Sequence, residues 1–146
     1  MKALSLIEPW ASLIALGAKK IETRSWHPPE KFLGMRFAIH ASKSREAIDD
    51  GTAERLFKLA GLSIPEPWPC GSIIAIATLG QYFPTEAFTP TKIEGAFGNY
   101  EPGRYAILIP EVLRLAEPIP CRGALGFWEV GGDALLHLNR IEALRP

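Results

Sequence analysis

Residues 17–26 read Gly-Ala-Lys-Lys-Ile-Glu-Thr-Arg-Ser-Trp and bring four charged side chains and an indole into ten positions. The second half of this stretch alternates as a β-strand does, so that Glu22, Arg24 and Trp26 share one face. Lys19 has the opposite parity and joins them only if it lies in the turn that precedes the regular strand. The stretch therefore predicts a strand surface on which a carboxylate lies between two cations, held by charge-assisted hydrogen bonds.

The segments on either side of this stretch predict how it is packed. Residues 3–7 show a short apolar strand pattern, and residues 9–16 place apolar side chains at helical spacing before a glycine. Residues 35–41 alternate again, with His40 on the polar face of a strand expected to lie beside residues 19–26. We expect a cleft between the helix and these two strands. A lone histidine in such a place is more often a hydrogen-bonded structural residue than a catalyst.

The remaining elements follow from apolar periodicity and from breaks at glycine and proline. Strands are expected over residues 71–82, 104–109, 111–117 and 124–130, and helices from about residue 44 to 60 with a break at Gly51, just before residue 97, and over residues 134–144. The first of these strands is apolar on both faces, which is typical of a central position. Pro118 and Pro120 are expected to end pairing. About six strands with short helices and no regular βαβ alternation predict an α+β fold, a small mixed β-barrel with a few short helices.

The composition limits the class of protein. A chain of 146 residues, 47% of them hydrophobic, is expected to form a single domain, residues 1–146, with a substantial core. No apolar run approaches the roughly 18 residues that a membrane span needs, and Glu8 and Pro9 come too early for a signal-peptide apolar region. We therefore expect a cytoplasmic protein with no membrane partner. Cys70 and Cys121 form no CxxC pair, and with three histidines neither a metal site nor a cofactor is expected.

The charge is balanced overall but unevenly distributed along the chain. Sixteen basic and sixteen acidic residues give a net charge of zero, which excludes a protein coated with positive charge for nucleic acid. Residues 19–45 nevertheless carry seven Lys or Arg against two Glu, a local balance of +5. This asymmetry predicts one positive face on an otherwise neutral molecule.

Several catalytic motifs are absent from the sequence. There is no GxGxxG opening a helix, no P-loop and no GxSxG elbow, so dinucleotide binding, nucleoside triphosphate hydrolysis and α/β-hydrolase chemistry have no support. The candidate ligand-binding residues that remain are Lys19, Lys20, Glu22, Arg24, Trp26, His40, Lys43, Asn99, Tyr100 and Arg104. Cations hold phosphate, and aromatic faces stack on bases with about 1–3 kcal/mol each. We expect RNA, single-stranded nucleic acid or a nucleoside-like small molecule as the partner. Trp10 and Trp128 are expected in the core; the alternatives are a pocket wall for Trp10 and a stacking surface for Trp128.

A family resemblance rests on the same stretch. Residues 17–24 match the signature glycine, x, lysine, two residues, glutamate, x and arginine, and the chain resembles the ASCH domains of the PUA-like superfamily. The resemblance extends, in the family's order, through residues 3–11, 38–43, 71–75, 97–100, 103–106, 118–120 and 123–128. It implies a PUA-like pseudobarrel with a cleft beside the first helix. It also implies a nucleic-acid-binding module, above all for RNA, which is the leading interpretation.

An enzyme is the alternative that the resemblance implies. Some small ASCH proteins resemble hydrolases of acylated cytidine that use a lysine and a threonine of this motif and a glutamate elsewhere. Lys19 matches the lysine, but Glu22 occupies the threonine position, and Thr23 lies one residue later on the other strand face. Other members resemble ribonucleases, for which Lys19, Glu22 and His40 would be the acid–base set. In an enzyme, Lys19 and Glu22 are the expected catalytic residues. A protein-interaction module without nucleic acid is the third interpretation.

Overall fold

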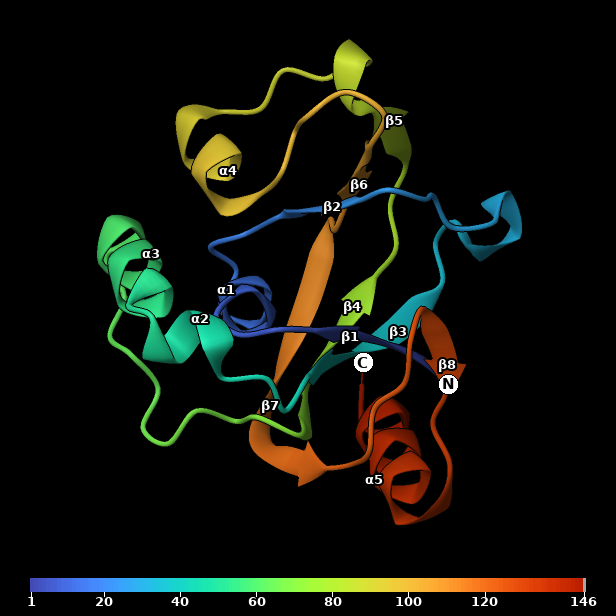
Figure 1. Ribbon diagram of the computed structural model, residues 1–146. Helices are drawn as coiled ribbons and strands as arrows, with labels where there is room; N and C mark the ends of the chain where they lie inside the picture. Colours follow the sequence, from blue (N-terminus) through green and yellow to red (C-terminus); the bar gives the residue numbers. More distant parts are fainter. Residues whose placement is uncertain (146) are drawn as a thin grey trace.

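The computed structural model describes residues 1–145, which contain eight strands and five α-helices. The strands are β1 (Lys2–Leu6), β2 (Ile21–Arg24), β3 (Arg36–Ala41), β4 (Ser72–Thr78), β5 (Tyr82–Pro84), β6 (Tyr105–Leu108), β7 (Glu111–Pro120) and β8 (Phe127–Glu129). The helices are α1 (Trp10–Ala15), α2 (Glu46–Asp49), α3 (Thr52–Ala60), α4 (Lys92–Phe97) and α5 (Gly132–Ala143), with two short 3-10 turns, η1 (Glu30–Phe32) and η2 (Thr85–Ala87). None of these helices is long and apolar enough to cross a membrane. Five strands form one sheet in the order β7-β4-β3-β1-β8, and three form a second in the order β2-β6-β5 (Figure 1).

The larger sheet packs an apolar layer on each of its faces. β1 runs parallel to β3, with Ser5 opposite His40, and antiparallel to β8. Leu4 and Leu6 of β1 point into the core layer that includes α1, whereas Ala3 points into the layer that includes α5. The two helices therefore lie on opposite faces of this sheet, as Figure 1 shows.

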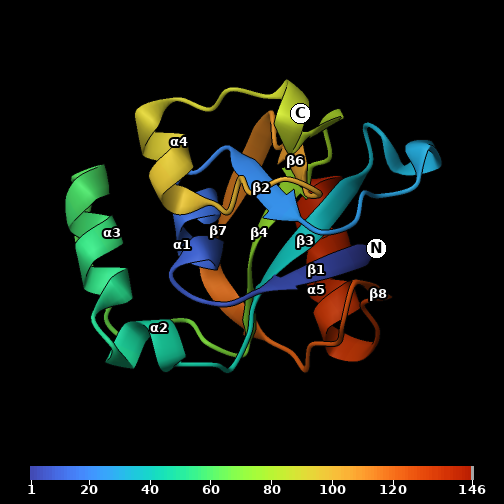
Figure 2. The same ribbon diagram turned by 45° about the horizontal axis from the view of Figure 1, so that its top comes forward.

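The second sheet and the short helices lie around helix α1. Its residues from Ala11 to Ala15 are all buried, and it is followed by Gly17 with a φ of +78°, a left-handed conformation that favours glycine. Leu13 packs with Phe57 of α3 and Phe97 of α4. In Figure 2, α1, α4 and β2 lie together on the side of the larger sheet away from α5. The turn of residues 17–20 thus leads from α1 directly into β2.

The expected α+β class with a few short helices is confirmed. The helix expected up to residue 60 is divided into α2 and α3 at Gly51, where the break is expected, and the most apolar strand is β4, an inner strand of the larger sheet. The three-residue strand β5 is missing from the expected set of strands. Within residues 1–145 the strands form two sheets and do not close into a barrel.

Two expected features of strand pairing are wrong. β2 pairs with β6, with Glu22 opposite Ile107, and does not lie beside β3, because β1 and β4 occupy both edges of β3. β7 continues through Pro118 and Pro120 and pairs with β4 as far as Ser72. Since β7 is an edge strand, the missing N–H of a proline can face away from the ladder, so the two prolines do not end the pairing.

The cations of residues 19–45 do not form the single positive face that the sequence predicts. Lys19 is buried. Arg36 pairs with Glu142 of α5 at 2.5 Å, and Arg45 pairs with Asp49 at 3.6 Å. Arg36 begins β3 whereas Arg45 follows its end, so these two arginines lie at opposite ends of the strand. The local excess of positive charge is therefore dispersed and partly neutralised.

Candidate functional site

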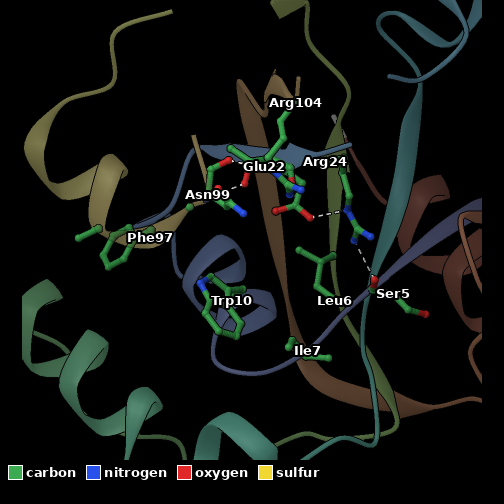
Figure 3. Close-up of a pocket in the computed structure, with 12 residues that line it drawn as sticks. Ser5, Leu6, Ile7, Trp10, Glu22, Arg24, Phe97, Asn99 and Arg104 are labelled. Carbon is green, nitrogen blue, oxygen red and sulfur yellow. Dashed lines mark hydrogen bonds and ion pairs between the residues drawn. The ribbon is translucent and has the colours of Figure 1, made fainter. Parts of the chain in front are cut away.

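A cleft of about 480 Å³ opens between α1, β2 and the segment that joins α4 to β6 (Figure 3). Its lining residues are Ser5, Leu6, Ile7 and Trp10 from β1 and the start of α1, Glu22, Thr23 and Arg24 from β2, and Ala96, Phe97, Gly98, Asn99 and Arg104 from α4 and the segment after it. The volume lies in the range of about 300–1,000 Å³ typical of small-ligand sites. In Figure 3 the apolar side chains of Ile7 and Trp10 lie below the charged ones. The guanidinium groups of Arg24 and Arg104 lie above them.

Glu22, Arg24 and Arg104 form one side of the cleft, which we call the charged wall, and Glu22 lies at its centre. Its carboxylate accepts a hydrogen bond from Nε of Arg24 through Oε2 at 2.8 Å, and Oε1 lies 3.5 Å from Nζ of Lys19. The side chain is 10% exposed, so both ion pairs are largely removed from solvent screening. The carboxylate thus lies between two cations, in the arrangement that the spacing of residues 19–24 predicts. Each of its oxygens lies near one cation, so the carboxylate fixes the position of Arg24 and Lys19 relative to each other.

Hydrogen bonds to backbone carbonyl oxygens fix the guanidinium groups of Arg24 and Arg104. Nη2 of Arg24 donates to the carbonyl of Ser5 at 3.0 Å. Arg104 donates from Nε to the carbonyl of Asn99 at 3.0 Å and from Nη2 to that of Thr23 at 3.2 Å. A guanidinium has five N–H donors, and the hydrogen bonds within residues 1–145 use two on each arginine. Three N–H groups on each arginine therefore have no hydrogen-bond partner within residues 1–145.

Lys19 lies behind this wall and does not line the cleft, which differs from the open position expected from the sequence. Its ammonium donates to the carbonyl of Ile21 and pairs with Glu22. The side chain is only 1% exposed. Burial lowers the pKa of Lys19, although the nearby carboxylates of Glu22 and Glu94 act in the opposite direction. The ammonium of Lys19 is therefore covered, and the charged group that it contacts is the carboxylate of Glu22.

Glu94 is a buried charged residue that the sequence reasoning missed. It lies in the first turn of α4, where its N–H donates to the hydroxyl of Thr91, and its Oε2 accepts from the backbone N–H of Lys20 at 2.8 Å. Its Oε1 and the hydroxyl of Tyr100 are buried without a partner in residues 1–145. Burial, together with Glu94 and Glu22, raises the pKa of Tyr100 to about 12. The spacing of Thr91 and Glu94 is a helix-start signal that could have drawn attention to this carboxylate.

Trp10 and Asn99 complete the cleft. Trp10 packs against two core clusters, as expected, but part of its surface also forms the cleft wall. Asn99 shapes the turn after α4, because its side-chain Oδ1 accepts from the N–H of Glu101 at 3.1 Å and its own N–H donates to Thr23 at 3.0 Å. Figure 3 shows the amide nitrogen of Asn99 directed into the cleft. The cleft therefore presents an indole surface and a further pair of N–H donors.

His40 belongs to a separate polar cluster on the other face of β1, which we call the His40 cluster: Ser5, His40, Cys121 and Trp128. Nε2 of His40 lies 2.7 Å from the carbonyl of Cys121, and Nδ1 lies 2.9 Å from the hydroxyl of Ser5. A carbonyl only accepts, so Nε2 carries the proton and Nδ1 accepts from Ser5. Trp128 donates to the same hydroxyl at 3.1 Å. Burial lowers the pKa of His40, which favours this neutral form.

Three other predicted site residues also lie outside the cleft. Trp26 packs on Phe127 with its ring centroid 5.9 Å away, and the guanidinium of Arg24 lies 5.8 Å from the Trp26 ring. Lys20 and Lys43 are exposed and do not contribute to the lining. Within residues 1–145, no group of three or more His, Cys, Asp or Glu side chains is arranged to hold a metal ion. The structure thus gathers Glu22, Arg24, Asn99 and Arg104 from the predicted set and places the others behind or beyond them.

Comparison with known proteins supports the resemblance seen in the sequence. Activating signal cointegrator 1 from Homo sapiens and from Mus musculus are each 30% identical to the chain over 77 residues, which is 52% of this chain and 13% of each relative. The chain therefore matches only a small part of these longer proteins. The crystal structure of ASCH from Zymomonas mobilis superposes with a TM-score of 0.56 at 17% identity, covering 96% of this chain and 94% of that one.

A mutant of the Zymomonas protein gives a TM-score of 0.54 at 16% identity, again covering 96% of this chain and 94% of that chain. At this level of identity the solved structures establish the fold alone. The family model of the ASCH domain matches residues 4–107, which include most of β1, all of α1 and β2, and every residue that lines the cleft. The chain therefore belongs to the ASCH domain family.

Proposed function

We propose that the cleft binds RNA or another single-stranded nucleic acid, with one nucleotide inside it. The observation that carries this proposal is the pair of arginines, Arg24 and Arg104, each held by two hydrogen bonds and each with three N–H groups left for a ligand. Planar guanidinium groups match phosphate oxygens well. A base stacked on an aromatic side chain contributes about 1–3 kcal/mol, and Trp10 offers such a surface in the same cleft.

Because the cations are dispersed, we expect the cleft to bind one nucleotide, and we do not expect a nucleic-acid strand to lie across a positively charged face. Arg36 and Arg45 are paired with carboxylates away from the cleft, and the net charge of the chain is zero. Long-range attraction of a polyanion is then weak. The affinity must come from the groups inside the cleft, and the nucleic-acid binding implied by the ASCH resemblance supports this reading.

The proposal is tested by measuring the affinity for a short fluorescent single-stranded RNA. Replacing Arg24 or Arg104 with glutamine removes charge-assisted hydrogen bonds worth about 1.5–3 kcal/mol, so each variant should bind at least about tenfold more weakly. Arg114→Gln is the matched control, because Arg114 is exposed on β7 and does not line the cleft. Unchanged affinity in folded Arg24→Gln and Arg104→Gln proteins would refute the proposal.

A hydrolase acting on acylated cytidine or on RNA is the second candidate function. The specific observation in its favour is the pairing of the Lys19 ammonium with Oε1 of Glu22 at 3.5 Å, at a position where burial lowers the pKa of Lys19 and Glu22 and Glu94 act in the opposite direction. A lysine with a lowered pKa is more readily available as a base or nucleophile, and Glu94 supplies a glutamate outside the motif. Turnover by the wild-type protein that is lost in Lys19→Met would support this function. No turnover of either substrate by the wild-type protein would exclude it.

A further inference from the structure

The side chains that line the cleft leave many hydrogen-bond donors without a partner in residues 1–145. The two arginines leave six N–H groups, and the amide of Asn99 adds two more. Glu22, the carboxylate in the lining, has one oxygen paired with Arg24 and the other with Lys19. A ligand that satisfies this wall must therefore bring several acceptors and negative charge.

A phosphate monoester fits this requirement better than the diester inside a nucleic-acid strand. A diester offers two non-bridging oxygens and one negative charge. A monoester offers three terminal oxygens and a charge of about −1.5 to −2 near pH 7. Two forked guanidinium groups with three unused N–H each match three terminal oxygens more closely than two.

The surroundings of the arginines also disfavour a strand that continues past them. Beyond Arg104 the chain presents two exposed carboxylates, Glu86 and Glu101. The carboxylate of Glu86 is fixed there because it accepts from the N–H of Gly103 at 2.6 Å. Glu101 is held by its backbone, whose carbonyl accepts from the hydroxyl of Thr85 at 2.8 Å. A following phosphate would meet like charge there. On the opposite side the cleft ends at the apolar surface of Ile7 and Trp10.

We propose that the cleft recognises a terminal nucleotide through its phosphate monoester, with the phosphate on Arg24 and Arg104 and the base against Trp10. This inference rests on the proposed function and narrows it from strands in general to phosphorylated ends. The same chemistry is present in a free nucleoside monophosphate, so the two sources must be separated by experiment.

The test compares one RNA sequence in three forms, with a 5′-phosphate, with a 3′-phosphate and with hydroxyl groups at both ends, beside the matching nucleoside monophosphates. One phosphorylated form should bind at least about tenfold more tightly than the hydroxyl form. Its preference should shrink below pH 6, where the monoester takes up a proton, and should disappear in Arg24→Gln and in Arg104→Gln. A monophosphate that binds as tightly as the preferred strand would identify the free nucleotide as sufficient; a weaker one would identify the strand end.

Different failures overturn different claims. Equal affinity for all three RNA forms, with a loss in Arg24→Gln, would refute the monoester inference and leave the proposed function standing. No binding of any RNA form or monophosphate would refute both. A second check is Glu101→Gln, which should raise the affinity for the hydroxyl form and so reduce the ratio of affinities between the phosphorylated and hydroxyl forms. Glu117→Gln, a change at an exposed position on β7, should leave this ratio unchanged. An unchanged preference in Glu101→Gln would contradict the argument from like charge.

Discussion

Two polar regions of this molecule meet at Ser5 and have opposite character. On one side of β1, the carbonyl of Ser5 accepts from Arg24 at the cleft. On the other side, its hydroxyl lies between His40 and Trp128 in the His40 cluster. Both ring nitrogens of His40 have partners, whereas Arg24 keeps three N–H groups without a partner in residues 1–145.

The difference separates a structural polar cluster from a binding site. A buried polar cluster whose hydrogen bonds are all made fixes one packing arrangement and offers nothing to a ligand. Charged groups that some hydrogen bonds fix in place, and that keep other N–H groups unpaired, are preorganised to bind a ligand. We therefore expect changes in the His40 cluster to affect stability, and changes in the cleft to affect ligand binding.

The largest effect on stability is expected for Gly123→Ala. A Cβ atom at Gly123 would lie 2.6 Å from Cε1 of His40 and 2.7 Å from the hydroxyl oxygen of Ser5, so the cluster would have to shift. Overpacking of this kind costs about 1–3 kcal/mol in the free energy of unfolding, measurable by urea denaturation. Gly95→Ala is the control, because its nearest contact is an ordinary 3.7 Å and alanine suits a helix. RNA affinity of the folded Gly123→Ala protein should equal that of the wild type; a large loss would show that the two regions are not separable.

A smaller effect is expected from pH. Burial lowers the pKa of His40 in the folded protein below the value of about 6.5 for an exposed histidine. Below pH 6.5 the unfolded chain therefore binds more protons than the folded one, so stability falls as the pH falls, until the folded-state pKa is passed. Burial raises the pKa of Glu8, which acts in the opposite direction above pH 4.5. The contribution of His40 is thus the difference between wild type and His40→Gln in urea denaturation over this range, and identical pH profiles would contradict it.

Glu22→Gln should change RNA affinity only slightly, by no more than about threefold, which is less than 1 kcal/mol. The change removes a negative charge from a site that binds phosphate, which favours binding. The change also weakens the interaction that fixes Arg24, and this effect lowers the RNA affinity. If Glu22 transferred or steered a proton in catalysis, the same change would lower a turnover rate by about 10²–10⁴-fold. Affinity and turnover measured on one variant therefore distinguish a binding cleft from an active site.

The smallest effect is expected for Lys43→Gln. Lys43 is exposed and lies outside the cleft lining, and at physiological salt a charge more than about 8 Å away is largely screened. Its replacement should change RNA affinity by less than about twofold. A loss comparable to that of Arg24→Gln would show that the binding surface extends well beyond the cleft.

Local patterns in the sequence predict that Lys19, Glu22 and Arg24 lie close together. Glu22 and Arg24 are two residues apart in a strand, so a shared face follows from strand alternation alone. The turn after Gly17 is short enough to bring Lys19 back to Glu22, and their 3.5 Å separation agrees with this. Asn99 and Arg104 are candidates because of their side-chain chemistry, and they lie in segments that resemble the ASCH family. Their placement beside β2 depends on a turn far along the chain.

Other features of the site depend on tertiary packing that the sequence does not display. Glu94 reaches the backbone of Lys20 across 74 residues, and no local pattern encodes that contact. The sequence predicts His40 in the cleft because it predicts the strand of His40 beside β2. The parallel pairing of β3 with β1 turns it instead to the face that carries Ser5 and Trp128. The helical spacing of Trp10 predicts a core residue correctly, but only the position of α4 leaves part of the ring exposed to the cleft.

The most direct test of the separation between the two regions is an NMR titration of the tryptophan indole N–H signals with a short 5′- or 3′-phosphorylated RNA. The chain has four tryptophans, Trp10, Trp26, Trp68 and Trp128, which can be assigned by single Trp→Phe changes. We predict that the Trp10 signal moves most, that Trp26, beside Arg24, moves less, and that Trp128 stays at its free position because its N–H remains bonded to Ser5. A Trp10 signal that does not move at saturating RNA, or a Trp128 signal that moves most, would contradict the assignment of the cleft as the binding site.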